Sequence, residues 1–125
     1  MTDSLFIGEG LLLRPTEFAR GPWSRDALHG GPVAALLARA IESVDAPLPM
    51  HPARLTIELL RPVPLAPLRL ATALLRPGKK VQLVAASLHA GDVEVARCTA
   101  LRIRRADLPL PDGAVNGDCE PPPEP

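Results

Sequence analysis

The sequence is poor in aromatic residues, cysteine and net charge, and each shortage excludes a class of function. Its 125 residues include two phenylalanines, one tryptophan and no tyrosine, so stacking on nucleic-acid bases is not expected. The 14 basic and 14 acidic side chains cancel, which removes the electrostatic basis for binding nucleic acid or an anionic membrane. Cys98 and Cys119, without a CxxC or HxxxH spacing, indicate neither a disulfide nor a metal site.

Long hydrophobic segments are also missing. Residues 1–4 carry no basic side chain and no long apolar run follows them, so we expect neither export nor membrane insertion, and a cytoplasmic protein. The length favours a single folded domain, which we place at residues 1–107. Residues 108–125 are rich in proline, glycine and acid, and are predicted to form a tail or a linker to a second domain.

What the sequence does contain is one strongly apolar helix, predicted from Pro32 to Val44. Proline suits the first helical position. Between Pro32 and Val44 the charged residues are Arg39 and Glu42. Apolar side chains surround nearly the whole circumference, so the helix is expected to be buried on several sides. Directly before it, His29-Gly30-Gly31 lets the backbone approach a ligand at the positive end of the helix.

Around this helix the pattern predicts about five strands. Residues 5–18 are expected to form one strand, bent or bulged at Gly8 and Gly10. Four more strands are predicted at residues 54–60, 68–76, 80–89 and 93–105, and short turns join the last three into an antiparallel meander. One helix with one antiparallel sheet is an α+β architecture. Because the helix is apolar on all sides, the sheet should curl around it, which is the hotdog arrangement.

Two short motifs resemble those of the acyl-CoA thioesterase-like hotdog family: Gly21-Pro22-Trp23, and His29-Gly30-Gly31-Pro32 at the start of an Ala/Leu-rich helix. More narrowly, the sequence is similar to the N-terminal half of double-hotdog proteins related to bacterial acyl-CoA thioesterase II. The resemblance covers about residues 5–106. It implies an acyl-CoA thioester ligand in fatty acid metabolism, with coenzyme A as part of the substrate, no cofactor and no metal. It also implies a homodimer or higher oligomer, or a second hotdog after the linker.

Thioester hydrolysis requires a polarised carbonyl group and an activated water. The N–H groups of Gly30 and Gly31, at the N-terminus of the helix, are the candidates for polarising the carbonyl. A carboxylate must activate the water. Related single-hotdog thioesterases carry this acid nine residues after the histidine, where this sequence has Ala38. In this sequence the candidates for the acid are Asp26 and Glu42. The resemblance to double-hotdog proteins implies instead that the acid belongs to a second hotdog domain or a partner subunit.

Three further residues are candidates for binding substrate: His29, Trp23 and Gln82. The alternatives are capping of the helix for His29, a core or interface position for Trp23, and ordinary pairing on a strand for Gln82. Arg102 and its neighbours near the end of the last strand are interpreted as a solvated face, with contact to coenzyme A phosphates as the alternative. The sequence thus predicts a thioesterase-family protein that hydrolyses an acyl-CoA thioester. The alternative is a non-catalytic N-terminal half that completes the sheet and the acyl pocket of a catalytic partner.

Overall fold

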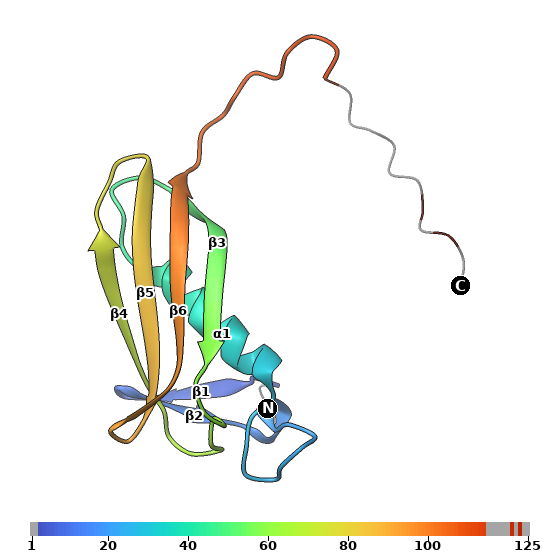
Figure 1. Ribbon diagram of the computed structural model, residues 1–125, viewed down its shortest axis with the longest axis vertical. Coiled ribbons are helices and arrows are strands. Elements are labelled where there is room, and N and C mark those ends of the chain that lie inside the picture. The colour runs from blue at the N-terminus through green and yellow to red at the C-terminus, as the bar shows by residue number, and fades with distance from the viewer. Residues whose placement is uncertain (1–2, 115–120, 122, 124–125) are drawn as a thin grey trace.

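Helix α1 (Gly30–Ser43) lies across one face of a four-stranded antiparallel sheet in the computed structural model, which describes residues 3–114, 121 and 123 (Figure 1). The strands are β3 (Met50–Leu59), β4 (Arg69–Arg76), β5 (Val81–Ala90) and β6 (Val93–Arg104). Their order across the sheet is β3-β6-β5-β4. The predicted meander is confirmed, because β4, β5 and β6 pair antiparallel in chain order. The α+β prediction of one helix against an antiparallel sheet is confirmed as well; that sheet has four strands, and two further strands form a separate sheet.

The N-terminal segment forms a hairpin and not the single bent strand predicted for residues 5–18. Strand β1 (Phe6–Glu9) pairs antiparallel with β2 (Leu12–Pro15), and the short 3-10 helix η1 (Glu17–Ala19) follows. Gly10 has a φ of 61°, a left-handed conformation that glycine adopts without strain. The single-strand prediction is wrong because Gly10 closes a tight turn that reverses the chain.

Helix α1 begins two residues earlier than predicted, with His29 as its N-cap. Pro32 still lies in the first turn, where a missing N–H costs no intrahelical hydrogen bond. The buried residues of the helix are Val33, Leu36, Leu37, Ala40 and Ile41. The exposed residues are Gly31, Ala35, Arg39, Glu42 and Ser43. The helix is therefore buried on the side that faces the sheet and open on the opposite side, so the prediction of burial on several sides is wrong for the described chain.

Small side chains in the middle of the sheet let α1 pack closely against it. The helix-facing residues of β6 are Ala96, Cys98, Ala100 and Arg102, and those of β5 are Gln82, Val84, Ala86 and Leu88. Buried and half-buried side chains alternate along β5, as expected for a strand with one face against the helix. On β6, the larger Leu101 and Ile103 lie on the face away from the helix. Cys98 is buried, and burial raises the pKa of its thiol.

Beyond β6, the described chain is irregular. Residues 105–114 contain no helix or strand and are exposed. The remainder of the predicted tail, including Cys119, lies outside the described residues apart from Pro121 and Pro123. In the part of the chain that is described, no helix is long and apolar enough to cross a bilayer.

Arg102 is only 2% exposed, which corrects its interpretation as part of a solvated face. Its Nη1 donates to the carbonyl oxygens of Ile41 (3.0 Å) and Val44 (2.7 Å), at the C-terminal end of α1. Its Nη2 donates to Oε1 of Gln82 (2.6 Å), which is also 2% exposed. A cation is favourable here because the last carbonyl groups of a helix are unpaired and carry partial negative charge. Burial lowers the pKa of the Arg102 guanidinium, which nevertheless remains protonated at neutral pH.

We therefore expect the Arg102→Met substitution to destabilise the fold by about 2–4 kcal/mol. It keeps the length of the side chain but leaves three buried oxygens without a donor. The matched control is Arg104→Met, which alters an exposed arginine of the same strand and should change stability by no more than about 0.5 kcal/mol. Urea unfolding followed by circular dichroism measures both variants. Equal stability of the two would contradict the role assigned to Arg102.

Candidate functional site

The loop that leads into α1 is held in place by backbone hydrogen bonds. The N–H of Gly21 donates to the carbonyl of Ala27 (2.8 Å), and the N–H of His29 donates to the carbonyl of Ala19 (2.9 Å). A Cβ on Gly21 would lie only 3.1 Å from the backbone nitrogen of His29, so this close crossing of the chain requires glycine. The N-terminus of the helix consequently has a fixed position relative to the loop.

His29 caps the helix, as the alternative interpretation of this residue proposed. Its Nδ1 accepts a hydrogen bond from the N–H of Gly31 at 3.0 Å. Because Nδ1 is the acceptor, the neutral ring carries its proton on Nε2. A Cβ on Gly31 would lie 3.1 Å from Nδ1, so glycine makes room for the imidazole. Of the two N–H groups predicted to polarise a carbonyl, that of Gly31 is thus occupied, and that of Gly30 has no acceptor within residues 3–114.

A cavity of about 320 Å³ opens beside Gly30, and we call it the helix-terminus cavity. Its lining consists of Leu28, Gly30, Val33, Leu59, Leu60, Arg61, Pro62 and Val63. A Cβ on Gly30 would lie 3.4 Å from Cδ1 of Leu59, so the glycine leaves the backbone accessible beside this wall. The N–H of Leu28 donates to the carbonyl of Val63 (2.8 Å), which joins the loop to the opposite wall.

Sequence reasoning missed the wall formed by residues 59–63, because this segment combines a strand end with a proline-broken connection. The available signal was the apolar pair Leu59-Leu60, which continues past the last residue of β3. Ligand cavities are lined mainly by apolar side chains, and here Leu59 and Leu60 border the cavity while remaining exposed.

Neither predicted acid of this chain lies in the helix-terminus cavity. Asp26 is exposed on the preceding loop, where its backbone carbonyl accepts a hydrogen bond from the N–H of Leu65 (2.8 Å). Glu42 is exposed in the last turn of α1, and at 1.5 Å per residue it lies about 18 Å along the helix from Gly30. Ala38 is half-buried. The described residues that line the cavity include no carboxylate.

The structure places the other two predicted binding residues away from this cavity. Trp23 is 94% exposed on the loop before the helix, which is incompatible with a core position in this chain. Gln82 is buried beside Arg102, at the opposite end of α1 from His29. Within the described ranges, no group of three or more His, Cys, Asp or Glu side chains is arranged to hold a metal ion.

The helix-terminus cavity therefore combines an apolar wall with a backbone donor at the positive end of a helix, an arrangement suited to holding a carbonyl oxygen. The model of the acyl-CoA thioesterase N-terminal domain matches residues 19–103. The chain belongs to this family. The matched segment of this acyl-CoA thioesterase N-terminal domain includes the capped helix, the helix-terminus cavity and nearly all of the four-stranded sheet. No protein with a curated description matches the chain.

Solved structures confirm the hotdog fold of this domain. The smu.793 protein from Streptococcus mutans UA159, bound to acetyl CoA, is 14% identical with a TM-score of 0.69, covering 84% of this chain and 92% of that one. The BH2602 protein from Bacillus halodurans, with CoA, is 19% identical with a TM-score of 0.64, covering 78% and 67%. A protein of unknown function with a hot dog fold from Alicyclobacillus acidocaldarius is 22% identical with a TM-score of 0.59. That match covers 94% of this chain but 44% of the other.

Replacing His29 with alanine should destabilise the fold by about 1 kcal/mol, because the N–H of Gly31 would lose its acceptor at the start of the helix. His29→Asn supplies another side-chain acceptor at the N-cap and should recover most of the loss. Urea unfolding monitored by circular dichroism compares the two variants with the parent. An asparagine variant as unstable as the alanine variant would show that the capping bond contributes nothing.

Proposed function

We propose that this domain binds an acyl-CoA thioester in the helix-terminus cavity and supplies the group that polarises its carbonyl. The observation that carries the proposal is the N–H of Gly30, which has no acceptor within residues 3–114 and lies at the positive end of α1, beside a cavity lined by apolar residues and Arg61. A thioester carbonyl oxygen would accept this hydrogen bond, and the aliphatic part of the acyl group would contact Leu59 and Val33. Membership of the acyl-CoA thioesterase N-terminal domain family supports this class of ligand.

In the proposed reaction, a water oxygen attacks the thioester carbon and the carbonyl oxygen takes up negative charge. The hydrogen bond from Gly30 becomes stronger at that stage, because a developing oxyanion is a better acceptor than a neutral carbonyl. A general base removes the proton from the attacking water. Collapse of the intermediate breaks the carbon–sulfur bond, and the proton passes to the thiolate. The products are a carboxylic acid and free coenzyme A.

We propose that the base comes from outside this chain, either from a second hotdog domain or from a partner subunit. The support is the absence of a carboxylate among the described residues that line the cavity, together with the distance of Glu42 from Gly30. Asp26, on the adjoining loop, is the acid of this chain that could still serve. The alternative function is a non-catalytic half that completes a partner's acyl pocket. It would use the same binding geometry, because in both cases the catalytic acid lies outside this chain.

The edge of the sheet beside the helix supports pairing with another hotdog. Strand β3 is an edge strand, so one side of its backbone has no neighbour in the described sheet. Leu55 and Leu59 are 40% and 55% exposed on its helix-facing side. An open edge with exposed apolar side chains is normally covered in a stable protein. We therefore propose that this edge pairs with a second copy or with a following hotdog domain.

Binding of a non-hydrolysable acyl-CoA analogue, in which a methylene group replaces the thioester sulfur and the carbonyl group is kept, tests the carbonyl site. We expect Gly30→Val to weaken this binding at least about tenfold, because its methyl groups would meet Leu59 and fill the cavity. The control is Asp92→Asn, an exposed substitution in the turn between β5 and β6, which should leave binding unchanged. Calorimetric titration gives the affinities, and circular dichroism checks the folding of each variant. Unaltered affinity in Gly30→Val would remove the basis of the proposal.

Release of free thiol from a panel of acyl-CoA thioesters tests where the base resides. If the base comes from another hotdog domain, the 125-residue chain should release little thiol, and Glu42→Gln should change nothing. Loss of measurable hydrolysis in Asp26→Asn, with binding of the analogue retained, would instead place the base on this chain.

A further inference from the structure

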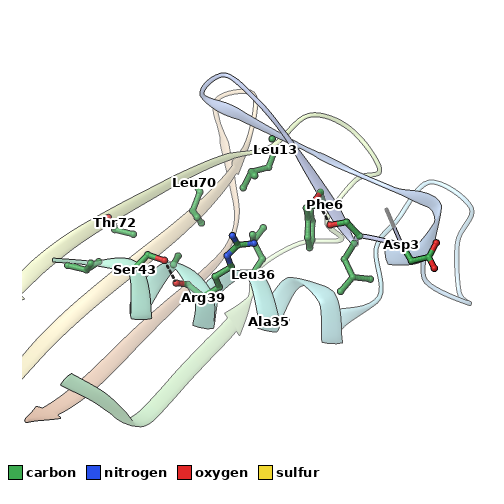
Figure 2. Close-up of a pocket in the computed structure, with 14 residues that line it drawn as sticks. Asp3, Phe6, Leu13, Ala35, Leu36, Arg39, Ser43, Leu70 and Thr72 are labelled. Atoms are coloured by element: carbon green, nitrogen blue, oxygen red, sulfur yellow. Dashed lines mark hydrogen bonds between the residues drawn. The ribbon is translucent and has the colours of Figure 1, made fainter. Parts of the chain in front are cut away.

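A second and larger cavity, of about 680 Å³, lies between the N-terminal hairpin, the middle and C-terminal part of α1, and the start of β4 (Figure 2). It shares no lining residue with the helix-terminus cavity. We call it the hairpin cavity. Its apolar lining includes Phe6, Leu13, Leu36, Ala40, Val44 and Leu70. Its volume falls within the roughly 300–1,000 Å³ typical of small-molecule sites.

Arg39 supplies the one positive charge among the lining residues of the hairpin cavity. Figure 2 shows its side chain extending from α1 toward Leu13 and Leu70, and the residue is exposed to solvent at the mouth of the cavity. Within residues 3–114 it forms no ion pair, and the hydrogen bond from the hydroxyl of Ser43 goes to its backbone carbonyl (2.7 Å). The one acidic lining residue, Asp3, has its carboxylate directed away from Arg39 in the same view.

An apolar cavity with one uncompensated guanidinium is complementary to an apolar molecule with one negative charge. A carboxylate matches a guanidinium particularly well, because the planar fork of arginine donates two parallel hydrogen bonds to its two oxygens. An aliphatic chain attached to the carboxylate would then bury its methylene groups against Phe6 and Leu36.

We infer that the hairpin cavity binds a linear aliphatic carboxylate, with its head group on Arg39 and its chain between the N-terminal hairpin and α1. This site is separate from the thioester site proposed above, and it requires neither the N–H of Gly30 nor a catalytic acid. The ligand is held by charge at one end and by apolar contact along its length. Binding should therefore weaken as the salt concentration rises, since the guanidinium is exposed.

Calorimetric titration of the 125-residue chain with sodium decanoate tests this inference. We expect saturable binding of one decanoate per chain, weakened at least about tenfold in Arg39→Leu, with an intermediate effect in Arg39→Lys. Decanol, which has the same chain without the charge, should bind the parent more weakly than decanoate. Decanol and decanoate should bind Arg39→Leu with equal affinity, because that variant no longer distinguishes the two head groups.

The matched control is Arg104→Leu, which removes an exposed arginine outside the hairpin cavity and should leave decanoate affinity unchanged. Backbone amide chemical shifts locate the ligand, and we expect changes at Ala35, Ala40 and Leu70. Changes confined to Gly30 and Leu59 would place decanoate in the helix-terminus cavity and overturn the inference. Equal affinity in Arg39→Leu would overturn it too. Absence of decanoate binding to the parent chain would also overturn it. A change of sedimentation in Arg39→Leu would then assign the cavity to contact with a second copy.

Discussion

The guanidinium of Arg102 determines where the C-terminal end of α1 lies on the sheet, because it joins two carbonyl groups of the helix end to Gln82 on the neighbouring strand. A charge buried to this extent is costly unless its donors find acceptors; both terminal nitrogens of Arg102 have them, whereas its buried Nε has none among the described residues. Small residues along β6 then let the helix rest close against the sheet. The helix position therefore depends on one polar contact at its end and on close apolar packing along its middle.

A helix of 14 residues is a rigid rod about 21 Å long, so fixing one end and one face also fixes the other end. At that other end, His29 closes the first turn and Gly21 allows the incoming loop to cross closely. Gly30, whose N–H has no acceptor within residues 3–114, thereby borders a cavity whose far wall comes from the segment after β3. The two cavities lie at different parts of this rod: one at its N-terminus, the other beside its middle and C-terminal turns.

The elements with strong periodicity could be predicted from the sequence. The apolar helix, the meander and the hotdog arrangement follow from local pattern, and so does the glycine-rich approach to the helix N-terminus. The contact between Arg102 and the C-terminal end of α1 could not be predicted. An arginine near a strand end is usually solvated, and the partners of Arg102 on the helix lie 58 and 61 residues away in the sequence. The N-terminal hairpin was missed for a different reason. A glycine between two apolar runs fits a bulge as well as a turn, and the positive φ of Gly10 separates the two only in the structure.

For the candidate site, the sequence identified the backbone donors but not which of them is free. That distinction depends on the His29 ring, whose hydrogen bond to Gly31 is a matter of side-chain orientation and not of residue spacing. The wall at residues 59–63 depends on how the chain returns past the helix, which no local pattern records. Both features are products of tertiary packing.

The exposure of Trp23 has a consequence for how this protein can be observed. It is the sole tryptophan, and the chain has no tyrosine, so ultraviolet fluorescence comes almost entirely from one loop residue that is already surrounded by water. Unfolding would leave the environment of this indole nearly the same, and its emission would report little about the core. A shift of the emission to shorter wavelength would instead signal that another molecule or domain has covered the loop before α1.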